Sequence, residues 1–401
     1  MKTKWETKTL GEVCEIGAGN SAPQKKEMFE EGEYPFFRTS DVGKIHLGII
    51  YDSVDMLNQK GIEKLKLFPQ GTLLFPKSGA STFLNHRVLM GVNGYVSSHL
   101  ATIKAKEKFI LDSFLYYYSR TIDSRNLMQD QNYPSLRLSD IGNIEISFPS
   151  LEEQKQIVKI LDEVFDSISK SKENAEKNLK NAKELFESYL EEIFSNPRED
   201  WEEKKLGEVC GFIRGPFGGS LKKSFFKKEG YAVYEQRHAI YNQFDNIRYF
   251  VDEKKFNEMK RFELFPDDLI MSCSGTMGKI AIAPKNIKRG IINQALLKLS
   301  PTKKLSNIFL KLWMESSDFQ RKIKEYSLGA AIQNVASVKI LKDIRMKLPT
   351  LQEQKVIVQK LDALSEQSKQ LEEIYKQKLK DLEELKKSML QKAFSGELTN
   401  K

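Results

Sequence analysis

Cationic, amide and hydroxyl side chains recur at corresponding places in the two halves of the chain. Groups of these types bind phosphate oxygens and the edges of bases in duplex DNA. The candidate DNA contacts are Arg38, Thr39, Lys77, Ser78, Arg87, Arg137, Arg214, Gln236, Arg237, Ser274 and Lys279.

A Ser-Gly loop follows an apolar run in each half. The first loop lies in residues 75–81 and the second in residues 271–277, with Ser78 and Ser274 at the same place, 196 residues apart. A Ser-Gly turn beside cations brings backbone N–H groups close to a phosphate. An ordinary surface turn explains the same residues equally well, so both interpretations stay open.

A second candidate surface lies earlier in each half, in residues 34–40 and 231–238. Arginine pairs with guanine and glutamine with adenine in the major groove, so Arg38, Gln236 and Arg237 are candidate base contacts. The alternative is that they are surface residues of a strand. Further candidates, each beside turn residues, are Arg137 and Arg214.

No motif for catalysis or cofactor binding is complete in the sequence. A P-loop around Gly275 fails, because Cys273 stands where its first glycine belongs and Ile280 where its Ser/Thr belongs. The four histidines, His46, His86, His99 and His238, have no metal-ligand spacing. The Asn/Asp-Pro-Pro-aromatic tetrad of amino-methyltransferases is also missing. We therefore expect no catalytic residue, metal or cofactor in this chain.

These candidate residues sit in a module that occurs twice. The opening Trp5 with residues 10–14 (Leu-Gly-Glu-Val-Cys) returns at Trp201 with residues 206–210. The spacing is 196 residues at the opening and 200 residues further on, where Pro149–Lys155 matches Pro349–Lys355. A repeat of this length indicates a duplicated domain and not a solenoid. Because the frames match closely and the middles match only in fragments, each middle is expected to recognise a different target.

Composition is that of a globular chain of two or three domains: 401 residues, 40% hydrophobic and 30% charged. The net charge of +9 is compatible with a nucleic-acid partner but is weak evidence alone. The sequence shows no membrane-length apolar run and no secretory signal. Its three separated cysteines form no disulfide pattern. We expect a cytoplasmic protein.

Each half begins with a mixed segment of about 150 residues and ends with a long helix. Short β-rich runs at residues 71–75 and 268–271, with helical patches at 110–118 and 308–313, indicate an α/β domain. Residues 151–195 and 351–395 contain no glycine or proline and show a coiled-coil spacing. The first seam is Leu161, Phe165, Ile168, Lys172, Ala175, Leu179, Ala182, Phe186, Tyr189 and Ile193. The second is Leu361, Leu364, Ser368, Leu371, Tyr375, Lys378, Leu382, Leu385, Met389 and Lys392.

We expect the two long helices to pack on each other, since neither can bury its seam alone. The pattern does not distinguish parallel from antiparallel pairing. Two helices that each pack on their own domain remain an alternative. The expected divisions are recognition domains at 1–150 and 197–350, and long helices at 151–196 and 351–401.

The order of these motifs resembles the specificity subunit of type I DNA restriction-modification systems. The resemblance rests on the duplicated Trp…Leu-Gly-Glu-Val opening, on residues 73–80, on the Pro-Leu-Glu-Glu-Gln helix entry and on Phe394–Leu398. It covers essentially the whole chain and implies an α+β fold. In that fold, two target-recognition domains are separated by long helices that pack as an antiparallel coiled coil.

This resemblance further implies recognition of a split, asymmetric site in double-stranded DNA, with one half read by each domain. Its implied partners are two methyltransferase subunits, which hold S-adenosylmethionine and methylate adenine N6, and restriction subunits that translocate and cleave DNA. Trp5 and Trp201 belong to the family's shared frame and are expected to be structural. Two rival interpretations are a two-domain scaffold that binds other proteins, and a stand-alone nuclease.

Overall fold

The computed structural model describes residues 5–128, 134–274, 276–327 and 338–399. The chain forms two compact units, one of Met1–Ala175 with Gln377–Lys401 and one of Glu176–Lys376. Each unit therefore holds one mixed α/β domain and a part of each long helix. Within the described part of the chain, no helix has both the length and the apolar character of a membrane span.

The first unit contains a five-stranded sheet of order β2-β9-β6-β7-β4, a three-stranded sheet β5-β3-β8 and the pair β1-β10. Its strands are β1 Glu6–Thr9, β2 Cys14–Ala18, β3 Tyr34–Phe37, β4 Leu47–Ile50, β5 Met56–Leu57, β6 Leu73–Pro76, β7 Arg87–Met90, β8 Tyr95–Val96, β9 Leu100–Ala105 and β10 Glu145–Phe148. Its short helices are α1 Leu10–Val13, α2 Thr39–Ile45, α3 Gln59–Ile62, α4 Asp112–Ser119 and α5 Leu138–Gly142, with 3-10 turns at Lys26–Met28, Ala80–Leu84 and Ser124–Leu127.

The second unit contains four-stranded sheets β12-β19-β16-β17 and β14-β13-β18-β15, and the pair β11-β20. Its strands are β11 Glu202–Lys205, β12 Cys210–Arg214, β13 Tyr231–Tyr234, β14 Phe250–Val251, β15 Glu263–Leu264, β16 Leu269–Ser272, β17 Ile280–Ile282, β18 Gly290–Ile292, β19 Leu296–Pro301 and β20 Arg345–Leu348. Its short helices are α7 Leu206–Val209, α8 Gln236–Tyr241, α9 Glu253–Glu258, α10 Asn307–Glu315, α11 Ser317–Ser327 and α12 Val338–Asp343, with 3-10 turns at Gly218–Leu221, Lys223–Phe225 and Lys260–Phe262.

The sequence repeat is a structural repeat. Strand β2 pairs with β9 so that Cys14 lies opposite Ala105, and β12 pairs with β19 so that Cys210 lies opposite Pro301. The expected strands and helical patches appear as β6, β16, α4 and α10. All four residues of β6 and of β16 are buried, as their apolar runs require.

The cysteines are free and buried. Burial raises the pKa of the Cys14 and Cys210 thiols to about 12 and that of Cys273 to about 11. Cys14 and Cys210 begin equivalent strands, so they act as small apolar side chains in the shared frame.

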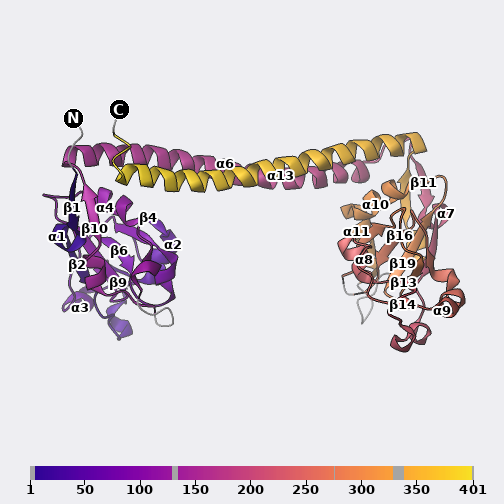
Figure 1. Ribbon diagram of the computed structural model, residues 1–401, viewed down its shortest axis with the longest axis horizontal. Helices are drawn as coiled ribbons and strands as arrows, with labels where there is room; N and C mark the ends of the chain where they lie inside the picture. The colour runs from indigo at the N-terminus through magenta and orange to yellow at the C-terminus, as the bar shows by residue number, and fades with distance from the viewer. Residues whose placement is uncertain (1–4, 129–133, 275, 328–337, 400–401) are drawn as a thin grey trace. The chain divides into compact units, whose positions relative to one another are not determined.

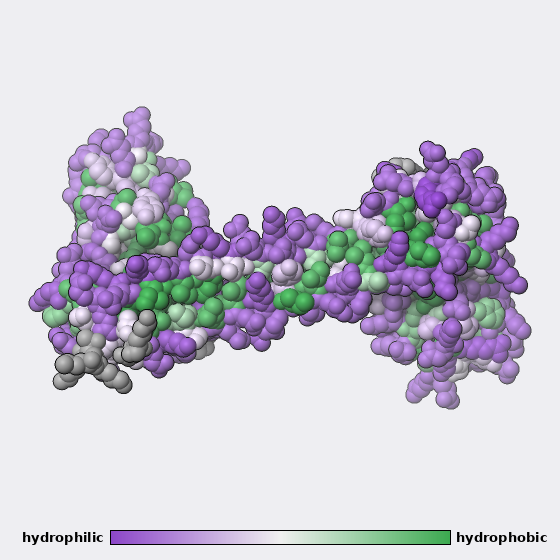
Figure 2. Space-filling view, turned by 90° about the horizontal axis from the view of Figure 1, so that it is seen from above, coloured by the Kyte–Doolittle hydropathy of each residue, from purple (hydrophilic) through white to green (hydrophobic). Residues whose placement is uncertain are grey.

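Two long helices, α6 (Leu151–Ser195) and α13 (Leu351–Phe394), run antiparallel to each other within each unit. In the first unit, Lys172 of α6 forms an ion pair of 3.1 Å with Glu383 of α13. In the second unit, Leu190 near the end of α6 shares an apolar cluster with Leu361 near the start of α13. Figure 2 shows hydrophobic side chains between the charged ones along both helices. The predicted antiparallel coiled coil is confirmed.

The predicted seam of α13 is wrong at three positions of its last third, Lys378, Leu385 and Lys392. Lys378 and Lys392 are exposed, and Leu385 is 44% exposed. After Tyr375 the buried side gains Leu379, Leu390 and Ala393 beside the predicted Leu382 and Met389. A helix with 3.6 residues per turn drifts against a strict heptad, and two successive spacings of four absorb the drift.

The second long helix ends at Phe394, so residues 395–399 do not continue it as expected. Gly396 has φ +77°, and the Glu397 N–H donates to the Lys392 carbonyl at 3.1 Å. This is the left-handed glycine stop common at helix ends. Gly396 lies against Trp5 of the same unit.

A buried glutamine ties α6 to the first domain. Gln154 has no exposed surface. Its Nε2 donates to the Phe109 and Pro149 carbonyls at 2.9 and 3.0 Å, and its Oε1 accepts the Leu111 N–H at 2.9 Å. One side chain therefore joins the helix start, the turn before it and the segment that leads into α4.

Gln354 makes the same connection in the second unit and is also fully buried. Its Nε2 donates to the carbonyls of Lys304 and Pro349 at 3.0 and 2.9 Å, and its Oε1 accepts the Ser306 N–H at 2.8 Å. The Gln of the Glu-Gln-Lys motif is therefore the anchor of the repeat.

Replacing Gln154 with leucine should destabilise the first unit, because one buried N–H and two buried carbonyls lose their partner. The expected loss in the free energy of unfolding is about 2–4 kcal/mol, measured by urea denaturation. The matched control is Gln156→Leu, at an exposed position two residues on. An equal loss in both variants would contradict the anchoring role.

Candidate nucleic-acid interface

Four candidate residues of the first domain, Arg38, Thr39, Lys77 and Ser78, lie at one edge, where β3 and β6 end and β9 begins. The Ser97 N–H donates to the Phe37 carbonyl at 2.9 Å, and the Lys77 N–H donates to the His99 carbonyl at 3.0 Å. These backbone bonds bring three separate loops to one place. Polar side chains from each loop can then act on the same ligand.

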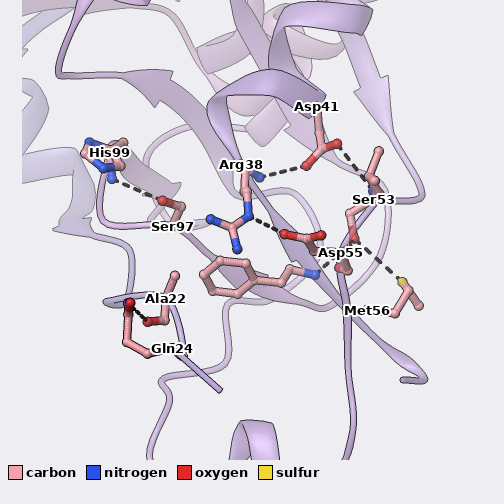
Figure 3. A network of polar contacts seen from close by, with 11 residues as sticks. Ala22, Gln24, Arg38, Asp41, Ser53, Asp55, Met56, Ser97 and His99 are labelled. Atoms are coloured by element: carbon pink, nitrogen blue, oxygen red, sulfur yellow. Dashed lines mark hydrogen bonds and ion pairs between the residues drawn. The ribbon is translucent and has the colours of Figure 1, made fainter. Parts of the chain in front are cut away.

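Arg38 and Thr39 begin α2 at this edge. The backbone N–H of Arg38 donates to Asp41 Oδ2 at 2.9 Å, and its guanidinium forms an ion pair with Asp55. Figure 3 shows the guanidinium lying between Asp55 and Ser97. Since about 37% of its side chain is exposed, Arg38 is held in position and still reaches solvent.

Ser78 and Lys77 follow β6 beside His99. The Ser78 hydroxyl and His99 Nδ1 are 2.7 Å apart, and His99 is exposed. His99 was not among the candidates, because it lies 21 residues after Ser78 and meets it only through the β6–β9 pairing. The loop therefore carries a specific polar pair, which an ordinary turn does not require.

Two glycines were also missing from the predicted site residues: Gly19 at this edge, and Gly215 at the equivalent edge of the second domain. A Cβ at Gly19 would lie 2.2 Å from the Ser97 carbonyl oxygen, and one at Gly215 would lie 1.8 Å from that of Asn293. Only glycine permits this approach of two backbones. Their equal spacing in the two halves was the signal that could have found them.

In the second domain, the equivalent edge brings Gln236 and Ser274 together. The Ser274 hydroxyl donates to Gln236 Oε1 at 3.0 Å, and Gln236 Nε2 is 3.5 Å from the Thr276 carbonyl. Gln236 is the first residue of α8, as Thr39 is of α2. This contact orients the amide of the predicted adenine contact.

Arg214 lies at the end of β12, close to the buried Cys273 thiol, whose pKa its charge lowers against the larger effect of burial. Arg237 follows Gln236 on α8 and is partly exposed. Arg137 caps α5 and Lys279 precedes β17, and both are exposed. The positive charge of Arg137 and Lys279 is exposed at the surface, which suits phosphate binding.

The two edges have different chemistry on one frame. Where the first domain has Arg38 and His99, the second has Glu235 and Ala295 at the equivalent strand ends. Among the described residues, no group of three or more His, Cys, Asp or Glu side chains could hold a metal ion.

A family model described as the type I restriction modification DNA specificity domain matches residues 2–180 and 198–382. The chain belongs to this family. Each match covers one α/β domain, so both halves are specificity domains.

Individual relatives agree with this assignment. The type I restriction enzyme MjaVIII specificity subunit of Methanocaldococcus jannaschii is 24% identical over 98% of this chain and 93% of its own length. The HsdS subunit from Thermoanaerobacter tengcongensis is similar in fold, with a TM-score of 0.69 at 22% identity over 98% of this chain and 97% of that one. A second solved chain, from a structure of the complex assembly and conformational transition of the type I R-M system, is also similar in fold. Its TM-score is 0.71 at 22% identity, over 99% of this chain and 100% of that one.

One predicted contact of the first specificity domain is wrong. Arg87 is only 1% exposed, so it cannot meet a phosphate at the surface. Its guanidinium donates to the His86 and Ile122 carbonyls at 2.8 and 3.2 Å and lies 3.4 Å from the centre of the Phe75 ring. Burial lowers the pKa of Arg87 to about 9. The residue supports the sheet and does not line the interface.

Arg87→Met should lower the free energy of unfolding of the first specificity domain by about 2–4 kcal/mol, since buried acceptors lose their donor. Lys77→Met, at the partly exposed edge, should change it by less than about 0.5 kcal/mol. Urea denaturation followed by circular dichroism measures both. Similar stability of the two variants would show that Arg87 is not structural.

Proposed function

We propose that the chain is the DNA-recognition subunit of a type I restriction-modification complex, and that each specificity domain reads one half of a bipartite, asymmetric duplex site. The observation that carries this proposal is the pair of equivalent edges with unlike side chains. A shared frame gives the same placement on DNA, and different side chains give different base preferences.

In this proposal the contacts divide into two kinds. Lys77, Arg137, Arg237 and Lys279 hold phosphates, fix the register and make binding dependent on salt. The serines Ser78 and Ser274 add hydroxyl contacts at the same two loops.

Base recognition comes from the side chains that other residues orient. In the first domain, Arg38 and Thr39 face the groove, with the Arg38 guanidinium directed by Asp55. In the second domain, Gln236 presents an amide that Ser274 orients, the geometry that suits the N6 and N7 edge of adenine. Arg214 lies on the same edge.

The chemistry would be supplied by partners. We infer two methyltransferase subunits that hold S-adenosylmethionine and methylate adenine N6, and restriction subunits that translocate and cleave DNA. Methylation within a duplex requires the base to be flipped out, at a cost of a few kcal/mol. This chain would hold the DNA while that occurs, in the cytoplasm and without a catalytic residue of its own.

Exchange of residues 1–150 for the same region of a relative should change only one half of the methylated sequence. Methylome sequencing of a host that carries the gene with its methyltransferase gives the result. A change in both halves, or in neither, would refute modular reading.

Gln236→Ala should relax one base position in the half-site of the second domain and weaken binding there by about 1–3 kcal/mol. The assembled methyltransferase complex, tested against duplexes with single base changes, reports the difference. Gln243→Ala, at an exposed position in the same domain, is the control. Unchanged discrimination in Gln236→Ala, or a uniform loss at all positions, would exclude it as a base contact.

These experiments also separate the rivals. A scaffold protein would leave the methylated sequence unchanged after domain exchange. A stand-alone nuclease would cleave DNA as the purified chain with a metal ion.

A further inference from the structure

One phenylalanine of the second unit is exposed almost completely. Phe217 exposes 83% of its surface, the largest fraction of any large hydrophobic side chain in the described part of the chain. A phenylalanine that a protein buries removes about 150–250 Å² from water, so this ring forgoes a large stabilisation. A single exposed hydrophobic residue is common and proves nothing alone. The position of Phe217 in the fold therefore has to carry the argument.

The loop that carries Phe217 is fixed at both ends. Before the ring, the Gly215 N–H donates to the Leu296 carbonyl at 2.9 Å, which continues the pairing of β12 with β19. After the ring, Leu221 is only 7% exposed and shares an apolar cluster with Val233 of β13. The fold therefore anchors the loop on either side of Phe217 and leaves the ring in solvent.

The same anchoring places Phe217 at the edge that holds Gln236, the predicted adenine contact. A Cβ on Gly215 would lie 1.8 Å from the Asn293 carbonyl oxygen, so the two backbones touch there. The Asn293 N–H donates at 2.9 Å to the carbonyl of Tyr234, which lies two residues before Gln236. Phe217 follows Gly215 by two residues, a span of at most about 7 Å. Phe217 and Gln236 therefore lie at one edge of the domain.

The segment around Phe217 is strongly basic. Residues 214–228 contain Arg214 and four lysines but no acidic residue. Lys222 and Lys223, which follow the loop directly, are both exposed. A cationic segment is complementary to the phosphates of duplex DNA. Charge complementarity therefore favours duplex DNA as the partner that covers this ring.

The chemistry of the ring selects one feature of the DNA. Phenylalanine has no hydrogen-bonding group, and the thymine 5-methyl is the apolar group that bases present in the major groove. Gln236 would read adenine in that same groove. We propose that Phe217 recognises thymine in the half-site of the second domain by packing its ring on the 5-methyl group. This inference rests on the proposed function, because it assigns one more base contact to the same edge.

The first domain has no equivalent of this contact. Ser21 stands 196 residues before Phe217, at the same place in the repeat, and is exposed. A serine hydroxyl cannot replace a ring against a methyl group. Thymine recognition by this loop is therefore confined to the second half-site.

The test uses the full chain assembled with its methyltransferase subunits and duplexes that carry its methylated site. In each duplex, one thymidine of the second half-site is replaced by deoxyuridine, which removes only the methyl group. Fluorescence anisotropy measures the affinity. At one position, the replacement should weaken binding about fourfold, the effect expected for one buried methyl group.

Three variants assign this effect to the ring. Phe217→Ser, which copies Ser21, should bind the thymidine and deoxyuridine duplexes equally. Phe217→Leu keeps an apolar side chain and should still prefer thymidine. Phe265→Ser is the matched control, since Phe265 is 52% exposed and precedes β16, whereas Ser274 follows that strand. It should discriminate as the unchanged protein does.

The outcomes separate this inference from the function on which it rests. If no thymidine responds, or if Phe217→Ser still prefers thymidine, the proposal is wrong although the complex reads its site. Failure of Phe217→Ser to assemble with the methyltransferase subunits, measured by size-exclusion chromatography, would identify a protein contact and exclude thymine recognition. If the unchanged complex shows no preference for its site, the proposed function fails, and this inference fails with it.

Discussion

The buried amide of one glutamine per unit is the constraint on which the rest of the fold depends. Gln154 and Gln354 each satisfy three backbone groups that would otherwise be buried without a partner. The amide sets the direction in which a helix of about 45 residues leaves its own domain. The apolar seam residues along the helix add stability. They cannot set its direction from the domain, since a heptad seam also permits the two helices to pack one heptad out of register.

Much of this architecture could be predicted from local sequence pattern. The two long helices and the buried strands β6 and β16 follow from spacing and apolar runs within short windows, and the duplication follows from motifs that recur 196 to 200 residues apart. The seam failed at Lys378, Leu385 and Lys392, because a strict heptad ignores the drift of a helix with 3.6 residues per turn. The burial of Gln154 could not be predicted either, because no local sequence pattern indicates which polar residue of a helix the domain will cover.

The candidate interface was harder to predict, because it is assembled by strand pairing. Ser78 and His99 meet only through the pairing of β6 with β9, and Ser274 meets Gln236 across loops 38 residues apart. Arg87 fails for the opposite reason: beside a loop in sequence, it starts a strand that is wholly buried. Residue type thus selected residues that the strands gather at one edge, while the direction of each side chain could be read only from the sheet.

The two equivalent cysteines make local unfolding of each unit measurable. Cys14 and Cys210 occupy the same place in two copies of one frame, and burial suppresses the thiolate in both. A thiol of this kind is alkylated only when its surroundings open, so its labelling rate is a measure of local unfolding. The alkylation rates of Cys14 and Cys210 therefore report local unfolding of the two units separately, and mass spectrometry can measure both rates in the intact chain.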